Sequence, residues 1–355
     1  MLTRVLFENF KNLRQVEVEL RPFTVLVGPN GGGKTSVLQG LSLATDLIQS
    51  LPYREVASDR PFHRAFAPEN VVSSGRSALR IGLADEGGQS FDLHVGLDPI
   101  QPIRLSMPGV DAPLHQALAL LRKTGAPSLS WSPRSALLQL DFKRLVAPST
   151  PETASPRLGP EGDGLASVMS FLAGAHPDRK SAIEADVAAI VPWFRRARVV
   201  PHRMTRSIGE FQLEEWGHRF LVETTDGAQV HAELVSEGTV LVLGLMTLLH
   251  EPDPPQLLLL DDIDRGLHLG AQVLLVRSLR ALQARRPDLQ IVATTHSPFL
   301  LQEFEASEVQ VLGLTPAGVR SRPLSTHPRF EQWRHTLGTG ELWANLGEEW
   351  VGDAA

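Results

Sequence analysis

The chain has 355 residues, no cysteine, and 40 acidic against 34 basic side chains, which gives a net charge of −6 at pH 7. With 42% apolar and 21% charged residues, it has a globular composition and enough length for one large core or two smaller ones. The lack of cysteine excludes disulfide frameworks, thiolate zinc sites and cysteine nucleophiles, and the mild acidity disfavours a surface that binds nucleic acid throughout.

The sequence shows no targeting or membrane segment. Arg4, Glu8 and Lys11 interrupt the start of the chain, where a signal peptide needs an unbroken apolar stretch. The longest uncharged apolar run, 239–249, is about half of the roughly 20 residues that a membrane span requires. We therefore expect a cytoplasmic protein that does not use a membrane.

The N-terminal region is predicted to form strands, a glycine-rich loop, a helix and a hairpin. The predicted strands are 2–7, 16–20, 23–27, 78–84 and 90–97, and the predicted helix is 36–50. The last two strands are joined by the turn-rich segment 85–88, which indicates an antiparallel unit.

The middle of the chain is less regular. Its predicted elements are helices at 113–123, 165–173 and 180–190 and a proline-rich loop at 147–164. There is no internal repeat and no heptad run long enough for a coiled coil.

Beyond residue 234, strands and helices alternate. The predicted helices are 239–250, 267–284 and 298–304, and the predicted strands are 256–260, 289–294, 309–314 and 318–324. The all-apolar strand 256–260 is typical of a parallel sheet that is covered on both faces. This order predicts an α/β architecture.

The segment Gly28–Thr35 fits the pattern G-x-x-x-x-G-K-[ST] and lies between a predicted strand and a predicted helix. Its glycines allow backbone N–H groups to turn toward an anion, and the following helix N-terminus favours negative charge. Lys34 can reach the β- and γ-phosphates of a nucleotide, and the Thr35 hydroxyl can bind Mg²⁺. The alternative is a glycine turn that only joins strand to helix, which the flanking elements disfavour.

Three further motifs follow or precede predicted secondary structure. Asp261 and Asp262 end the strand 256–260, where ligands of α/β sheets bind, although an acid there can also simply cap a helix. His296 follows the strand 289–294 and is either a phosphate contact or a structural histidine. Ser236 begins a helix, as an N-cap or as a phosphate contact.

The joint order of these motifs resembles a known family, the ATP-binding-cassette-type ATPases of the SMC/RecF/OLD-like group, often called AAA-family ATPases. The segments that carry the resemblance are 7–13 (FENFKNL), 28–35, 234–239 (LVSEGT), 257–262, 266–268 (GLH), 294–298 (TTHSP), 340–343 (GELW) and 347–350 (GEEW). The stretch from about 100 to 190 is matched only loosely.

The resemblance implies a P-loop NTPase fold: an α/β, bilobed ATPase head with a mixed sheet and an antiparallel β subdomain. We expect residues 1–355 to form this one head. Within it, 1–100 would be the lobe with the P-loop and antiparallel sheet, 101–230 a helical and irregular insertion, and 231–355 the lobe with the remaining motifs.

The family pattern also implies roles for individual residues, with ATP and Mg²⁺ as cofactors. The nucleotide-binding residues would be Lys11, Asn12, Asn30, Gly31, Gly32, Gly33, Lys34, Thr35, Ser36, Ser236 and Gly238. Thr35 and Asp261 would hold Mg²⁺, Asp262 would be the general base, and His296 the switch histidine. Ser236 and Gly238 would act in trans, across a head-to-tail homodimer that sandwiches ATP.

The sequence departs from the family pattern at three places. Asp262 stands where glutamate is usual, and its shorter side chain predicts slow hydrolysis or a tightly held ATP state. Residues 263–266 read IDRG where Pro-Glu-Asn-Gly is common, and Asp264 could partly compensate. No Q-loop glutamine can be placed, although Gln89 and Gln101 are available.

The densest basic run, 193–206, has two interpretations. Its arginines and aromatics could engage a nucleic-acid backbone. The favoured alternative is the solvated face of a strand with Trp193 and Phe194 in the core.

We expect an ATPase whose nucleotide state controls a dimer acting on DNA or on an effector protein or nuclease, in DNA repair or anti-phage defence. The alternative is a non-hydrolysing, ATP-bound scaffold for an effector, and a weaker one is a transporter ATPase subunit. The lack of long helical arms disfavours a chromosome-tethering SMC, and the length of 355 residues argues against an appended Toprim nuclease.

Overall fold

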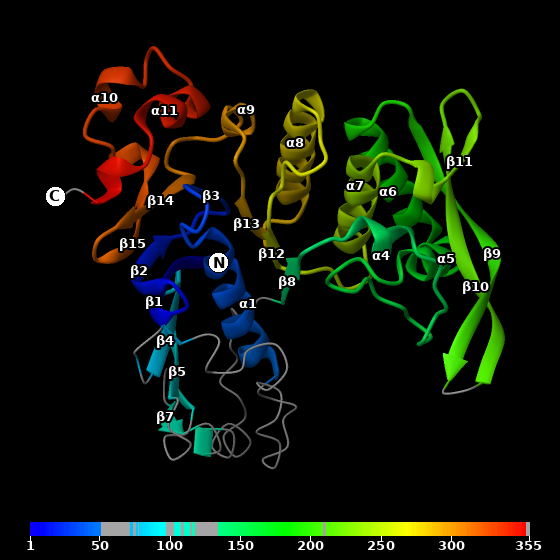
Figure 1. The fold of residues 1–355 in the computed structure, drawn as a ribbon, viewed down its shortest axis with the longest axis horizontal. Coiled ribbons are helices and arrows are strands. Elements are labelled where there is room, and N and C mark those ends of the chain that lie inside the picture. Colours follow the sequence, from blue (N-terminus) through cyan, green and yellow to red (C-terminus); the bar gives the residue numbers. More distant parts are fainter. Residues whose placement is uncertain are drawn as a thin grey trace. The chain divides into compact units, whose positions relative to one another are not determined.

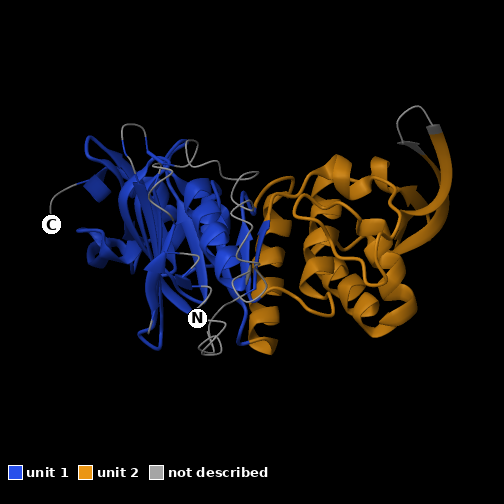
Figure 2. Ribbon diagram, turned by 90° about the horizontal axis from the view of Figure 1, so that it is seen from below, with its two compact units in different colours: residues 1–137, 256–263, 287–355 blue, residues 138–255, 264–286 orange. Residues whose placement is uncertain are grey.

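The computed structural model describes residues 1–50, 72–73, 76, 78–96, 103–107, 110–113, 116–117, 134–208 and 211–352. The chain forms two compact units, each made of discontinuous segments (Figure 2). Unit 1 comprises residues 1–137, 256–263 and 287–355, and unit 2 comprises 138–255 and 264–286. Both terminal regions of the sequence therefore belong to unit 1. Figure 1 colours these regions blue and red.

A six-stranded mixed sheet forms the centre of unit 1. Its strands are, in sheet order, β15 (Gly318–Pro323), β14 (Val309–Thr315), β3 (Phe23–Val27), β13 (Gln290–Thr294), β12 (Leu257–Leu260) and β8 (Ser135–Leu138). β14, β3, β13 and β12 are parallel, and every residue of β3, β12 and β13 is buried. Full burial explains why these strands read as apolar runs rather than alternating patterns.

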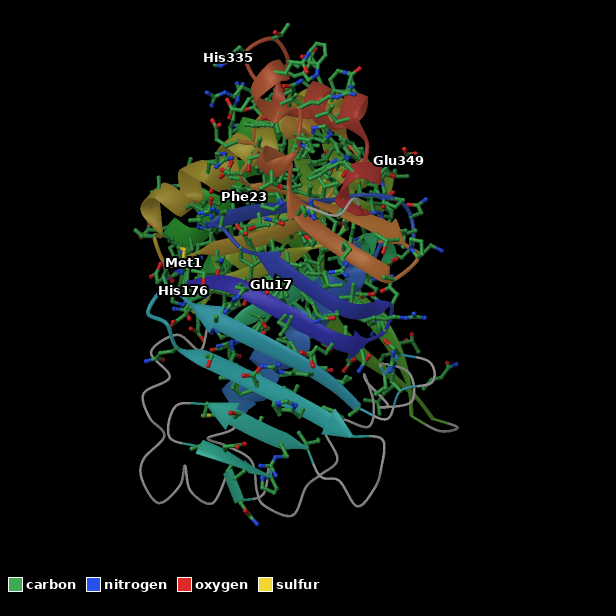
Figure 3. The ribbon with its side chains drawn as sticks, turned by 90° about the vertical axis from the view of Figure 1, so that its left-hand side faces the viewer. Met1, Glu17, Phe23, His176, His335 and Glu349 are labelled. Atoms are coloured by element: carbon green, nitrogen blue, oxygen red, sulfur yellow. The ribbon has the colours of Figure 1, made fainter. Side chains whose placement is uncertain are left out.

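A second sheet of unit 1 is antiparallel, and Figure 3 shows its strands side by side. Its strands are, in sheet order, β2 (Leu13–Glu19), β1 (Leu2–Phe10), β4 (Ala78–Asp85), β5 (Ser90–Gly96), β6 (Arg104–Met107) and β7 (Val110–Pro113). Alternate residues of β4 and β5 are buried, and the burial of β1 and β2 alternates over part of each strand, which is the pattern of a sheet with one face on the core.

Helix α1 (Lys34–Ser50) packs against this antiparallel sheet. A β-carbon on Gly40 would lie 2.3 Å from the ring of Phe7, so glycine allows the helix to approach the strand. Leu38, Leu41 and Ala44 are fully buried in the same hydrophobic cluster. The position of α1 follows from this packing, and its first residue is Lys34.

Short helices complete unit 1 after β13. They are α9 (Pro298–Leu301), α10 (Phe330–Trp333), α11 (Thr339–Leu346) and the 3₁₀ turns η4 (Leu324–Thr326) and η5 (Glu349–Gly352). η5 packs on β14 and α11 on α9, so the C-terminal residues lie against the mixed sheet.

Unit 2 combines a helical layer with a three-stranded sheet. Its helices are α4 (Phe142–Val146), α5 (Leu165–Ala175), α6 (Pro177–Ile190), η3 (Ala232–Leu234), α7 (Glu237–Leu249) and α8 (Leu269–Arg285), and its strands are β9 (Phe194–Ile208), β10 (Phe211–Thr224) and β11 (Gln229–His231). From Gly238 to Leu249 nearly every residue of α7 is buried, which makes α7 the central helix of the unit.

The structure confirms the predicted α/β class with a mixed and an antiparallel sheet. One predicted helix is wrong at its start, because Pro113 ends strand β7, and most of the remainder of 113–123 lies outside the described residues. The sequence also did not reveal how far β9 and β10 extend, since the long hairpin alternates less regularly than the strands of unit 1.

The basic run 193–206 lies at the start of this hairpin, on β9 and the residue before it. Phe194 is buried as predicted, whereas Trp193 is 40% exposed and does not belong to the core. Trp193 precedes the strand, and its carbonyl accepts a hydrogen bond from the backbone of Thr225. The expectation for Trp193 was therefore wrong.

Among the described residues, no helix combines the length and the apolar character needed to cross a bilayer.

Candidate nucleotide-binding site

The glycine-rich loop lies where β3 ends and α1 begins, at the carboxyl edge of the mixed sheet. Gly28, Gly31 and Gly33 have φ angles of 143°, 76° and 90°, values that residues with a β-carbon rarely adopt. A β-carbon on Gly33 would also lie 2.6 Å from the side chain of Leu13. The glycines are thus required by the backbone, and the loop presents its N–H groups beside the N-terminus of a 17-residue helix.

Lys34 is the first residue of α1 and is 7% exposed. Its ammonium group donates hydrogen bonds to the backbone oxygens of Gly28 (2.9 Å) and Pro29 (3.0 Å). Burial lowers the pKa of Lys34 below its usual value, while nearby Asp262, Asp261 and Glu348 act in the opposite direction. The cation is therefore held over the loop by backbone atoms and surrounded by carboxylates.

Asp261 follows β12, and hydroxyl groups from two other elements converge on it. The Thr35 hydroxyl lies 3.0 and 3.2 Å from its two carboxylate oxygens, and the Thr294 hydroxyl donates to Oδ1 at 2.8 Å. A carboxylate and a hydroxyl are the hard oxygen ligands that Mg²⁺ prefers. The donor set fits Mg²⁺ held by Thr35 and Asp261, with water and phosphate oxygens completing the coordination. Among the described residues, no cluster of three or more His, Asp or Glu side chains is arranged to hold a metal ion.

Asp262 has an exposed side chain and a backbone φ of 52°. Its backbone N–H donates to the Thr294 hydroxyl at 2.7 Å, the same hydroxyl that donates to Asp261. Thr294 therefore fixes both acids, the first through its carboxylate and the second through its backbone. Thr294 lies in a motif that the sequence singled out, but nothing local indicated that its hydroxyl would face β12.

His296 follows β13 by two residues, and its side chain is exposed. The backbone on either side of it is anchored: the Thr295 N–H donates to Leu26 O at 3.3 Å, and Ser297 caps α9 through Leu300 N–H. β13 is parallel to β3, so His296 emerges at the same edge of the sheet as the glycine-rich loop.

Lys11 and Asn12 form the turn between β1 and β2. The Asn12 side chain donates to the Gly31 carbonyl at 2.7 Å, which ties this turn to the glycine-rich loop. Lys11 has a φ of 51°, its amine contacts Gln39 of α1, and burial lowers its pKa. Both predicted residues thus lie beside the loop. The remaining predicted residues of the loop and first turn are Asn30 and Gly31, which are exposed, Gly32, which is buried, and Ser36, which is half-buried.

The predicted trans residues lie in unit 2, at the N-terminus of α7. Ser236 is the N-cap residue, and its hydroxyl lies 2.8 Å from that of Thr239. A β-carbon on Gly238 would lie 2.2 Å from the carbonyl oxygen of Gly266. The segment 266–268 is therefore packed directly on the start of this helix, and Arg265 and Glu237 form an ion pair of 2.8 Å beside it.

Gln139 follows β8 at the point where the chain passes from unit 1 into unit 2. β8 borders β12, and the two strands begin together, since the Arg134 carbonyl accepts from the N–H groups of Gln256 and Leu257. Gln89, by contrast, ends the turn between β4 and β5, and Gln101 lies outside the described residues. The sequence analysis did not identify the strand before Gln139, because four residues give too weak a pattern to be recognised.

Comparisons with known proteins match two separate segments of the chain. Residues 1–52 match an AAA ATPase domain family, and residues 132–302 match an AAA domain family whose description names the AbiEii toxin of a type IV toxin–antitoxin system. The chain is 32% identical over 111 residues to an OLD nuclease of Thermus scotoductus, covering 28% of this chain and 20% of the relative. It is 28% identical over 134 residues to the DNA replication and repair protein RecF of Vibrio vulnificus, covering 32% and 36%.

Solved structures extend the likeness to the whole fold. An SMC head bound to the C-terminal winged-helix domain of ScpA matches 90% of this chain and 96% of its own, with a TM-score of 0.60 and 13% identity. An SMC head of Pyrococcus furiosus matches 95% and 100%, with a TM-score of 0.59 and 12% identity. The curated relatives are matched over only 20% to 36% of their own length.

The chain has a P-loop NTPase fold with the architecture of an ABC-type ATPase head. Together, the matches confirm the predicted resemblance to the SMC/RecF/OLD-like group of AAA-family ATPases.

Proposed function

We propose that unit 1 binds ATP with Mg²⁺ and that the chain hydrolyses it slowly. The observation that supports this most directly is the convergence of Thr35 and Thr294 on Asp261, next to a buried Lys34. The elements concerned come from both ends of the sequence, so a chance glycine turn does not explain why a hydroxyl, a carboxylate and an ammonium meet there. Backbone N–H groups and Lys34 bind the phosphates, and Thr35 and Asp261 hold the metal.

Within this proposal, Asp262 and His296 orient and deprotonate the water that attacks the terminal phosphate. The Asp262 side chain is exposed at the edge of the sheet, and its backbone is fixed by Thr294. Because aspartate reaches about one methylene less far than glutamate, water is positioned less well and turnover is slow. Gln139, at the passage between the two units, takes the Q-loop role. A turnover number equal to that of relatives with glutamate at the position of Asp262 would contradict the prediction of slow hydrolysis.

We further propose that ATP joins two copies of the chain, with Ser236 and Gly238 of one copy completing the site of the other. The start of α7 offers free backbone N–H groups and a hydroxyl, the groups that a phosphate binds. Loss of the terminal phosphate after hydrolysis removes charge-assisted hydrogen bonds, so the dimer would depend on the nucleotide state.

Size-exclusion chromatography of the wild type and Lys34→Ala, each with and without Mg-ATP, tests both proposals. The wild type should shift to a dimer with Mg-ATP, and Lys34→Ala should remain a monomer. A wild type that binds ATP without any shift contradicts the sandwich dimer but not nucleotide binding. A wild type that binds no ATP contradicts both.

The dimer would act, in the cytoplasm, on DNA or on an effector protein such as a nuclease, in DNA repair or anti-phage defence. Relatives named as a DNA repair protein and a nuclease support this range. The net charge of −6 and the pairing of the arginines at 195, 196 and 198 with Glu223 favour the protein partner over DNA. Stimulation of turnover by double-stranded DNA would reverse that preference.

A non-hydrolysing scaffold that retains ATP and recruits an effector is the second candidate, and the shortened base Asp262 favours it. Measuring phosphate release from Mg-ATP separates the two candidates. Sustained release above that of Asp262→Asn supports the slow ATPase, and its absence with ATP still bound supports the scaffold.

A further inference from the structure

The C-terminal segment 347–352 is anchored on β14 of unit 1. Gly347 has a φ of 60°, which allows the chain to turn after α11, and its carbonyl accepts from the Trp350 indole N–H at 3.1 Å. The Trp350 ring packs edge-on against His327 at 4.9 Å, and Val351 is 1% exposed. These contacts fix the residue between them, Glu348, in one place.

β14 connects this segment with the start of the glycine-rich loop. A β-carbon on Gly28 would lie 2.2 Å from the Leu312 carbonyl oxygen, so β14 runs directly beside the entry to the loop. A β-carbon on the next residue of β14, Gly313, would lie 2.9 Å from the Glu348 carbonyl oxygen. The Glu348 backbone therefore lies against β14, one residue along that strand from the point that borders the start of the glycine-rich loop. Figure 3 labels the next residue, Glu349.

Glu348 and Glu349 are adjacent carboxylates in different surroundings. Glu348 is half-buried and close enough to Lys34 to oppose the lowering of its pKa, whereas Glu349 is exposed and exerts no such effect on Lys34. Within the described residues, the Glu348 side chain forms no hydrogen bond or ion pair that would neutralise it. A substitution of Glu348 can therefore test the effect of its charge on the loop, with the same substitution of Glu349 as the control.

The charge of Glu348 lies on the opposite side of the loop from the other two carboxylates. In sheet order, β14 borders β3 on one side, while β12, which carries Asp261 and Asp262, lies on the other. A bound Mg²⁺ compensates Asp261 in the proposed function, whereas among the described residues Glu348 has no ion pair and only the coulombic attraction of Lys34. A polyphosphate that binds the loop therefore meets an unneutralised negative charge near the lysine that attracts it.

We propose that Glu348 sets the affinity of the nucleotide site: its carboxylate opposes binding of the phosphate anion, and it opposes ATP more strongly than ADP because ATP carries one more negative charge. This inference rests on the proposed function, because it requires the loop to bind nucleotides. The C-terminal segment 347–352 thus weakens phosphate binding by the glycine-rich loop near the N-terminus. Weaker binding favours release and exchange of the nucleotide over permanent retention.

Isothermal titration calorimetry with Mg-ATP and Mg-ADP tests the proposal on the full chain. Glu348→Gln should bind ATP about three- to tenfold more tightly than the wild type, with a smaller gain for ADP, as expected for removing one charge near a phosphate. The gain should shrink at high salt because screening weakens the repulsion. Glu348→Asp keeps the charge and should bind like the wild type, as should the control Glu349→Gln.

Three outcomes overturn the proposal: unchanged binding by Glu348→Gln, weaker binding, or an equal gain in Glu349→Gln. Weaker binding would instead mean that the carboxylate contacts the nucleotide directly. If Glu348→Gln does not fold, as judged by its melting temperature, Glu348→Ala serves as the second neutral variant. A wild type that binds no nucleotide contradicts the proposed function itself, whereas a wild type that binds and a Glu348→Gln that behaves identically contradict only the role of Glu348.

Discussion

Two regions of this chain concentrate charge, and they use it in different ways. On the β9–β10 hairpin of unit 2, the arginines at 195, 196 and 198 surround Glu223, with distances of 3.1, 2.9 and 3.8 Å. At the glycine-rich loop of unit 1, the hydrogen bonds of the Lys34 ammonium go to backbone carbonyls, and the Asp261 carboxylate is bound by the hydroxyls of Thr35 and Thr294 rather than by the lysine.

The difference indicates which charges are structural. In the hairpin, opposite charges satisfy one another and Glu223 is buried, so removing one partner would leave buried charge unpaired and destabilise the strand pair. At the loop, the cation and the acids are held apart by backbone and hydroxyl groups, so each keeps the capacity to bind another group. A basic run is thus a weaker indication of ligand binding than a single lysine with no carboxylate partner.

The largest expected effect comes from breaking the loop. Lys34→Ala removes a charge-assisted contact to phosphate and should weaken ATP binding roughly 10- to 100-fold, measured by calorimetry. The arginine variant Arg196→Ala removes a cation of the hairpin and should leave ATP affinity unchanged. Equal losses in both variants would contradict the distinction between the two regions.

Asp262→Asn separates chemistry from binding within the loop site. Because the amide cannot accept a proton, phosphate release should fall about 100-fold, while ATP affinity stays within a factor of a few. Asp262→Glu should raise the rate by restoring the reach that the family pattern provides. A decrease with glutamate would mean that the left-handed backbone at this position accepts only the shorter residue.

Thr294→Val tests whether one hydroxyl fixes both acids. The valine keeps the shape but removes the acceptor of the Asp262 N–H and one of the two hydroxyls at Asp261 Oδ1, so turnover should fall about tenfold with little change in ATP affinity. Thr294→Ser retains the hydroxyl and should recover most of the activity. Full activity in the valine variant would show that Thr294 has no positioning role.

The smallest effect on nucleotide chemistry is expected from the hairpin. Glu223→Gln should lower the melting temperature and leave ATP binding intact, because Glu223 lies among arginines in unit 2. The Arg196 guanidinium lowers the pKa of Glu223 in the folded state below its usual 4.5. The stabilisation is therefore present above about pH 4.5 and is lost as the pH falls through the lower folded-state pKa.

Thermal melts of the wild type and Glu223→Gln across that pH range check the sign. The two melting temperatures should differ at neutral pH and converge at acidic pH. A constant difference would mean that the carboxylate contributes by packing rather than by charge.

The sequence alone was sufficient to predict the P-loop, the strand that ends in Asp261 and Asp262, and the α/β class. Each of these depends on local physics: glycines that adopt positive φ, apolar runs that form buried strands, and hydroxyl or carboxylate groups directly after them. The surrounding helices also follow a local pattern, the helical spacing of their apolar residues, and most were located to within a few residues.

Only the tertiary structure decided which distant groups meet. Thr294 reaches Asp261 because β13 pairs with β12, and the segment with Glu348 lies near the glycine-rich loop because η5 packs on β14. Pairing and packing of this kind join residues from opposite ends of the chain, and no local preference of the residues encodes that proximity. The composition that excluded cysteine chemistry at the outset agrees with a site built from glycine, lysine, threonine and aspartate, but the third carboxylate beside that lysine was visible only in the fold.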